Sequence, residues 1–96
     1  MIILRVLIAI LTDVIIVQGF QQSQRVKDAS DLGALIRLRR KQLGLTQQEL
    51  ADASGCSIMY VSNLERGKET AELGIALRIV NLLGLDLLAV DRGHRR

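Results

Sequence analysis

The sequence predicts an all-α fold, a bundle of four to five helices followed by a short C-terminal strand. Between residues 30 and 83, apolar residues recur at spacings of three and four, which is the period of an amphipathic helix. Glycines at positions 44, 55, 67 and 84 separate these periodic segments, and the chain contains no proline. The length of 96 residues suits one small domain.

Composition narrows the classes of function. Cys56 and His94 are the only cysteine and the only histidine, so neither an internal disulfide nor a cysteine-based zinc site is expected. No nucleophile–base pair or phosphate loop is recognisable, and the sequence therefore predicts no enzyme, no metal and no cofactor. The net charge of +3 at pH 7 permits a polyanionic partner without requiring one.

Three segments differ in character: an apolar N-terminal extension and linker (residues 1–29), the helical segment (30–91) and a basic tail (92–96). Residues 1–20 are largely responsible for the positive mean hydropathy of the chain, and three interpretations of them stay open. They have the length of a membrane anchor, although Asp13 disfavours insertion by about 2.5–3.5 kcal/mol and no signal-peptide cleavage site follows. They could instead reflect a start codon assigned too far upstream, or a strand or helix that packs on the domain.

The first predicted helix begins at an N-cap, Ser30, and ends before Gly44, where glycine tolerates the left-handed conformation. Its apolar stripe consists of Leu32, Leu35, Ile36 and Leu43. Its opposite face carries Arg37, Arg40 and Lys41, with Arg39 to one side.

Two short helices follow. Thr46 and Glu49 have the spacing of a capping box, which starts a helix that runs to about Ser54 and stops at Gly55. Ser57 is the next N-cap candidate, for a helix over residues 57–65 that is closed by Gly67.

A fourth helix is predicted over residues 70–83, before Gly84. One face is formed by Leu73, Leu77, Val80 and Leu83, and Ile79 and Leu82 widen it. The segment Leu85–Asp91 is too short for another full helix and is typical of a strand. Because a lone strand leaves its backbone hydrogen bonds unmade, the pattern predicts pairing with a second copy, hence a homodimer. The predicted dimer contacts are Leu85, Leu87, Leu88 and Val90. The alternative is a helical turn that frays.

The two short helices have a small-and-apolar pattern that favours a close crossing. Ala51 is small where the second helix crosses, Gly55 allows a tight turn, and Val61 and Leu64 anchor the second helix to the core. Cys56 is interpreted as a small core residue. Such a pair occurs as a plain helical hairpin, but it also suits DNA docking, in which the second helix enters the major groove and the first crosses the phosphate backbone.

Residues 38–68, LRRKQLGLTQQELADASGCSIMYVSNLERGK, resemble the Xre/Cro-type helix-turn-helix family. The motifs are L-T-Q-x-x-L-A at residues 45–51, the turn glycine at 55, and S-x-x-E-x-G at 62–67. The resemblance covers residues 31–91 and implies a lambda-repressor-like helix-turn-helix bundle, with residues 30–91 as the DNA-binding domain. The closing run GIALRIVNLLGLDLLAVD is similar to HipB-type antitoxins, dimeric repressors that bind their own operator and a HipA-type kinase toxin.

The resemblance also implies roles for individual residues. The expected contacts with base edges are Ser57, Ile58, Met59, Ser62 and Asn63. The expected contacts with phosphates are Arg40, Lys41, Gln47, Tyr60, Arg66 and Lys68. Glu65 is expected to be structural, paired with an arginine such as Arg39. Ile58 and Met59 stand where family members often have polar readers, so they can contact thymine methyl groups but cannot make bidentate hydrogen bonds.

The sequence therefore predicts a cytoplasmic, homodimeric repressor that binds double-stranded operator DNA, the autoregulating antitoxin of a type II toxin–antitoxin pair. Two alternatives remain. One is a protein-interaction module on a helix-turn-helix scaffold, for which the apolar Ile58 and Met59 are the best support. The other is a membrane-tethered regulator anchored by residues 1–20.

Overall fold

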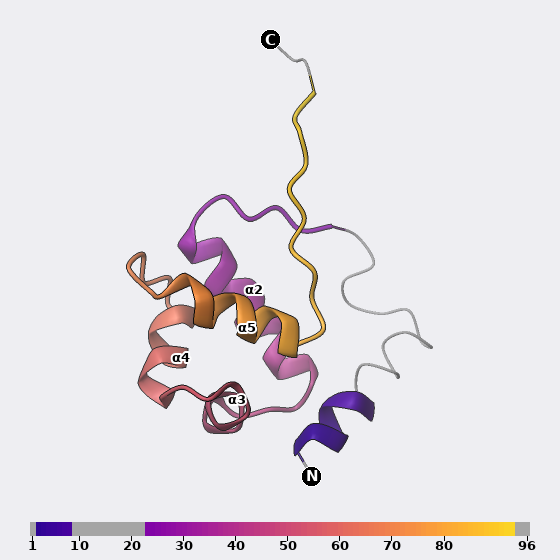
Figure 1. Cartoon of the computed structure of the whole chain (residues 1–96), viewed down its shortest axis with the longest axis vertical. Helices are drawn as coiled ribbons and strands as arrows, with labels where there is room; N and C mark the ends of the chain where they lie inside the picture. Colours follow the sequence, from indigo (N-terminus) through magenta and orange to yellow (C-terminus); the bar gives the residue numbers. More distant parts are fainter. Residues whose placement is uncertain (1, 9–22, 94–96) are drawn as a thin grey trace.

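A computed structural model describes residues 2–8 and 23–93, which form a helical bundle with an extended C-terminal segment (Figure 1). The N-terminal helix covers residues 2–8. Four further helices follow in the described part of the chain: α2 (Ala29–Gln42), α3 (Gln47–Ser54), α4 (Ile58–Glu65) and α5 (Leu73–Leu82). The predicted all-α class is confirmed.

The predicted C-terminal strand is not formed. Residues 85–92 have no regular secondary structure and run away from the bundle (Figure 1). A strand exists only through ladder hydrogen bonds to a neighbouring strand, and no segment of the described chain supplies one.

The start of α2 differs from the prediction. Asp28, not Ser30, is the N-cap, because its carboxylate accepts a hydrogen bond from the Asp31 backbone N–H at 2.8 Å. The Asp31 carboxylate in turn accepts from the Lys27 N–H at 3.0 Å. The Asp28 carboxylate thus satisfies a backbone donor that a helix leaves unpaired at its start, and the Asp31 carboxylate holds the residue before the cap. The helix begins earlier than the apolar stripe alone indicated.

The caps of α3 and α4 are as predicted. The Thr46 hydroxyl accepts from the Glu49 N–H at 3.0 Å, and the Glu49 carboxylate accepts from the Thr46 N–H at 2.9 Å. Gly55 ends α3 with a φ of +72°, in the left-handed region. The Ser57 hydroxyl then caps α4 by accepting from the Tyr60 N–H at 3.0 Å.

The buried face of α5 differs from the predicted one. The helix begins at Leu73 rather than near residue 70, and Leu73 and Leu77 are exposed. The residues that it buries, together with its C-cap, are Ala76, Ile79, Val80 and Leu83. Two overlapping apolar stripes are present in this segment, and packing against α3 selects the second.

The core lies where α2, α3, α4 and α5 meet. Its fully buried side chains are Ile36, Leu50, Val61, Ile79, Val80 and Leu83. α2 and α4 approach closely at Gly33, where a Cβ atom would lie 2.3 Å from the Leu64 carbonyl oxygen. A glycine at this point inside α2 is therefore required by the close packing of α2 against α4.

The N-terminal helix packs on the bundle. Val6 is buried in the core cluster and Ile2 lies against it, which agrees, over residues 2–8, with the interpretation of a segment packed on the domain. Residues 9–22, including Asp13, and the tail residues 94–96 lie outside the described part of the chain. None of the described helices combines the length and apolar character needed to cross a bilayer.

Candidate nucleic-acid interface

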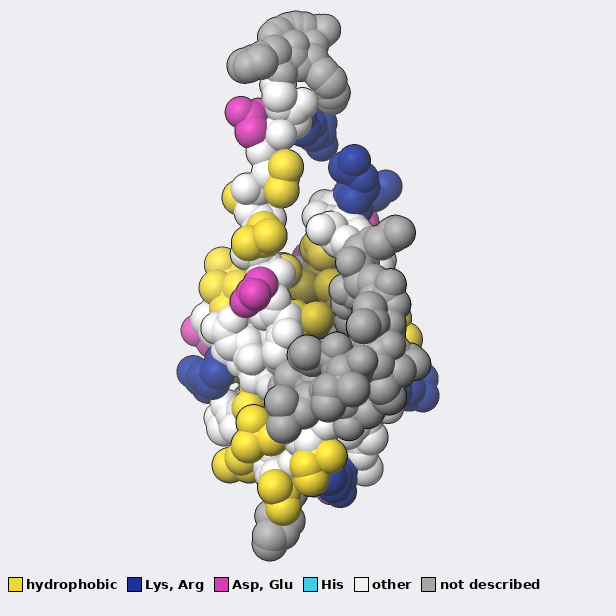
Figure 2. Space-filling model, turned by 90° about the vertical axis from the view of Figure 1, so that its right-hand side faces the viewer, with side chains coloured by type: hydrophobic (Ala, Val, Ile, Leu, Met, Phe, Trp, Pro, Cys, Tyr) yellow, Lys and Arg dark blue, Asp and Glu magenta, His cyan; other side chains and the backbone are white. Residues whose placement is uncertain are grey.

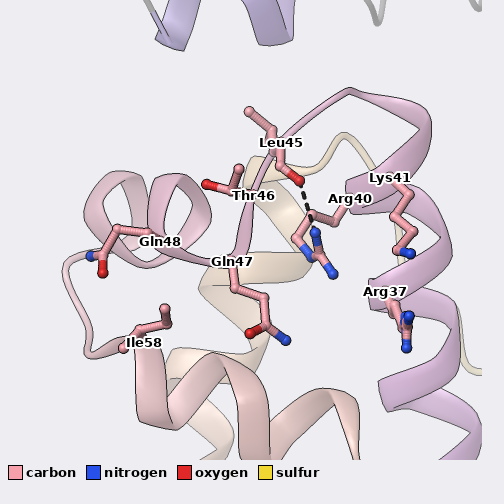
Figure 3. Close-up of a pocket in the computed structure, with 8 residues that line it drawn as sticks. All are labelled: Arg37, Arg40, Lys41, Leu45, Thr46, Gln47, Gln48 and Ile58. Atoms are coloured by element: carbon pink, nitrogen blue, oxygen red, sulfur yellow. Dashed lines mark hydrogen bonds between the residues drawn. The ribbon is translucent and has the colours of Figure 1, made fainter.

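A groove with cationic and polar walls lies between α2 and the start of α3 (Figure 3). Arg37, Arg40 and Lys41 follow α2 along one side, while the residues that begin α3 form the other, and Ile58 lies at the start of α4 below them. The full lining is Arg37, Arg40, Lys41, Leu45, Thr46, Gln47, Gln48 and Ile58. An exposed helix start of this kind favours anions, because its backbone N–H groups and dipole point outward.

A buried ion pair holds the groove together. Arg40 donates from Nε and Nη2 to the two carboxylate oxygens of Glu65, at 2.6 and 3.0 Å. It also donates from Nη1 to the Leu45 carbonyl at 2.8 Å, and Gln47 Nε2 donates to Glu65 at 3.0 Å. One carboxylate on α4 therefore connects α2 with the start of α3.

Two expectations about these arginines need correction. Glu65 pairs with Arg40, not with Arg39, whose Nε donates to the Leu83 carbonyl at 2.9 Å. Arg40 was expected on the solvent-facing side as a phosphate contact, but it is buried and its guanidinium is used within the protein. Residues 39 and 40 are adjacent, and the helical period alone could not decide which of them faces α4.

The remaining expected phosphate contacts differ in availability. Lys41 and Lys68 are exposed, while Gln47 is half-buried with its amide held by Glu65. The Tyr60 hydroxyl donates to the Glu72 carbonyl and so ties α4 to the start of α5. Burial raises the pKa of this phenol.

Arg37 also lines the groove, although the sequence placed it on the helix face without predicting a contact with phosphate. Its position four residues before Lys41 is the signal in the sequence that could have identified it.

The exposed surface of α4 combines an apolar first turn with a polar second turn. Ile58 and Met59 are 43% and 62% exposed. Arg66 folds back along the helix, where Nη1 donates to the Ser62 hydroxyl at 2.5 Å and Nη2 donates to the Asn63 side-chain oxygen at 2.7 Å. The opposite face of α4 buries Val61, Leu64 and Glu65.

The turn before α4 is anchored from α5. Arg78 Nη1 donates to the Ser54 carbonyl at 2.8 Å, at the end of α3. Cys56 is partly buried against the core, as expected, and burial raises the pKa of its thiol. The thiol therefore stays protonated at neutral pH and acts as a small packing group.

The residues expected at a dimer contact do not share one environment. Leu85 packs against the core, and its N–H donates to the Val80 carbonyl at 3.1 Å. Leu87, Leu88 and Val90 are exposed, the last two by 78% and 81%. Figure 2 shows hydrophobic side chains spaced along this tail, clear of the bundle.

The helical pair α3–α4, its glycine turn and the cationic groove define a class of protein. The helix-turn-helix family model matches residues 36–90, more than half of the chain. An HTH-type transcriptional regulator of Sinorhizobium fredii is 38% identical over 74 residues, which are 77% of this chain and 97% of that protein. The chain belongs to the helix-turn-helix family of DNA-binding transcription regulators.

Further similarities lie within this family. The ImmF control region 10 kDa protein of Bacillus phage phi105 is 42% identical over 60 residues, 62% of this chain and 67% of that protein. Among solved structures, HipB in the HipB–O4 20mer complex matches with a TM-score of 0.67 and 28% identity, covering 73% of this chain and 99% of that one. A chain of the HipA–HipB–O2–O3 complex matches with the same TM-score, identity and coverage. The expected resemblance to HipB is confirmed.

Proposed function

We propose that this protein is a sequence-specific repressor that binds double-stranded operator DNA, and that it is the autoregulating antitoxin of a type II toxin–antitoxin pair. The proposal includes a homodimer, a HipA-type kinase as protein partner, a cytoplasmic location, and no enzymatic activity or cofactor. Residues 30–91 are its DNA-binding domain.

The observation that carries the proposal is the position of the exposed first turn of α4 beside the cationic groove. Lys41 and Arg37 line the groove with the start of α3, and Ile58 reaches it from α4. A phosphate in the groove would receive positive charge from α2 and the dipole of α3. Ile58 and Met59 would then lie at base edges, where apolar side chains contact thymine methyl groups.

The dimer is supported by the exposed tail. Leu87, Leu88 and Val90 expose apolar surface on a segment without secondary structure, and pairing with the same segment of a second copy would satisfy its backbone and cover these side chains. The HipA–HipB complex among the similar structures supports the choice of protein partner.

The test is a fluorescence-anisotropy titration of the full chain against the duplex upstream of its own gene, with a scrambled duplex beside it. We expect preference for the upstream duplex. If the dimer neutralises six to ten phosphates, affinity should fall by roughly 10³–10⁵ between about 50 and about 200 mM salt. Lys41→Met should weaken both duplexes alike and reduce the salt slope by about one per protomer.

Arg92→Met is the matched control, because it removes one positive charge from the exposed tail, away from the groove. Its salt slope should stay close to that of the unmodified chain. Weak binding without preference between duplexes would contradict the repressor proposal. It would favour the protein-interaction module, for which the exposed Ile58 and Met59 are the specific observation.

A further inference from the structure

Three polar side chains on the exposed surface of α4 and at its cap have oxygen atoms that already accept hydrogen bonds from the protein. The Ser57 hydroxyl accepts from the Tyr60 N–H at 3.0 Å. Arg66 donates to the Ser62 hydroxyl oxygen at 2.5 Å and to the Asn63 side-chain oxygen at 2.7 Å. These are the three polar residues of α4 and its cap that were expected at base edges.

The orientation of the Asn63 amide follows from the chemistry of its partner. A guanidinium has five N–H donors and no acceptor, so the Asn63 atom that faces Arg66 must be the oxygen. The Nδ2 group, with two N–H donors, is then the part of the amide that faces away from Arg66, whereas the oxygen can accept a further hydrogen bond only beside the guanidinium. Ser57 and Ser62 likewise keep their hydroxyl hydrogens as donors.

These groups lie on one face of the helix. Residues 58, 59, 62, 63 and 66 follow the three- and four-residue spacing that brings side chains together on a helix surface, and the opposite face is buried. Ile58 and Met59 add no hydrogen-bond acceptor apart from a weak thioether. This face therefore offers DNA methyl and methylene groups in its first turn and mainly hydrogen-bond donors in its second.

The major groove distinguishes bases by a pattern of donors and acceptors. Guanine presents two acceptors, N7 and O6, and thymine presents the acceptor O4 beside its methyl group. Adenine presents the acceptor N7 beside an exocyclic amino donor, and cytosine presents an amino donor alone. We infer that α4 reads keto bases, guanine and thymine, on the strand that it faces, and discriminates against the amino groups of adenine and cytosine. This inference rests on the proposed function of DNA binding.

Arg66 is the positioning residue in this scheme. Asparagine ordinarily reads adenine with both ends of its amide, accepting from N6 and donating to N7. In this chain the accepting end is held by Arg66. An adenine or cytosine amino group that approached Asn63 Oδ1 would also meet the guanidinium N–H groups, and donors would face donors. The contact therefore selects which bases Asn63 can read.

The experiment is a selection from a duplex library with a randomised core, using the full chain, followed by sequencing of the bound DNA. Asn63→Ala identifies the position that Asn63 reads, as the one at which base preference disappears. The unmodified chain should enrich guanine or thymine there on the contacted strand. Arg66→Met frees the Asn63 oxygen and should raise recovery of adenine at that position by about fivefold or more, given the strength of a bidentate contact.

Lys68→Met is the matched control, since it removes a neighbouring exposed charge and leaves both Arg66 contacts in place. It should lower affinity for all sequences alike and leave base preference unchanged. The inference is overturned if the unmodified chain enriches adenine or cytosine at the Asn63 position, or if Arg66→Met changes affinity alone. A library from which the unmodified chain enriches no sequence would instead refute the proposed function itself, and the inference with it.

Discussion

Two arginine–glutamate pairs in this molecule have nearly the same shortest N–O distance but different surroundings. Arg40 Nε lies 2.6 Å from a Glu65 carboxylate oxygen, and Arg5 Nη2 lies 2.7 Å from a Glu49 carboxylate oxygen. The first pair joins α2 to α4, with side chains 9% and 3% exposed. The second joins the N-terminal helix to α3, with side chains 49% and 33% exposed.

Burial, more than distance, determines how strongly the fold depends on each ion pair. Inside the bundle, each charge has lost its water and depends on its partner, so loss of one leaves the other uncompensated. At the surface, water and salt replace a lost partner at little cost. The buried pair therefore determines how α2, α3 and α4 fit together, while the exposed pair adjusts the position of an appended helix.

The largest effect is expected from Glu65→Ala. The substitution leaves Arg40 buried without its carboxylate and releases Gln47, and we expect a loss of about 3–5 kcal/mol in the free energy of unfolding. Urea denaturation followed by circular dichroism measures this loss. The double substitution Arg40→Met with Glu65→Leu should recover most of it, because no unpaired charge remains. A double variant as unstable as Glu65→Ala would show that the cost has another origin.

A smaller effect is expected from Gly33→Ala, at the contact between α2 and α4. The new methyl group would lie 2.3 Å from the Leu64 carbonyl and 2.8 Å from the Glu65 carbonyl, so the helices must separate, at a cost of about 1–3 kcal/mol. Thermal denaturation measures it.

Gly74→Ala is the control for helix propensity. Its nearest neighbour would be a flexible Glu72 side-chain oxygen at 3.3 Å, and we expect no loss or a gain of about 0.5–1 kcal/mol. Equal losses in the two variants would contradict the close approach of α2 to α4.

The smallest effect on stability is expected from Arg5→Gln. The hydrogen bond from Arg5 is the main cause that lowers the pKa of the Glu49 carboxyl, followed by the hydrogen bond from the Thr46 backbone. The substitution should raise the pKa of Glu49 towards its ordinary value, while the capping contact keeps it somewhat below. An NMR titration of the Glu49 carboxyl in both chains measures the change.

The contribution of Glu49 to stability depends on pH. A carboxyl whose pKa is lower in the folded state contributes stability at neutral pH, and this contribution is lost as the pH falls through the lowered pKa. The part that Arg5 supplies should be absent from Arg5→Gln and should shrink in high salt. A Glu49 pKa that is the same in both chains would refute the contact between the N-terminal helix and α3.

Much of the fold was readable from local sequence. The capping box of Thr46 and Glu49, the Ser57 cap and the end of α3 at Gly55 were predicted correctly because each depends on residues a few positions apart. The cap of α2 was predicted at the wrong residue because the sequence offers two candidate cap residues close together. Asp28 and Ser30 are both good N-cap residues, and in the structure it is the Asp28 carboxylate that accepts from a backbone N–H of the first turn, that of Asp31.

The features that required tertiary structure all depend on which side of a helix meets its neighbour. Packing placed Arg40 rather than Arg39 against Glu65, and the second of two apolar stripes of α5 against α3. It also brought Arg5 to Glu49 across 44 positions of sequence. The spacing of apolar residues and the short local motifs specify the helices, the residues at which they end and the family of the chain, because all of these depend on residues that are close in sequence. Which of several similar helix faces becomes buried is decided only in the folded chain, because burying each face has a different free-energy cost.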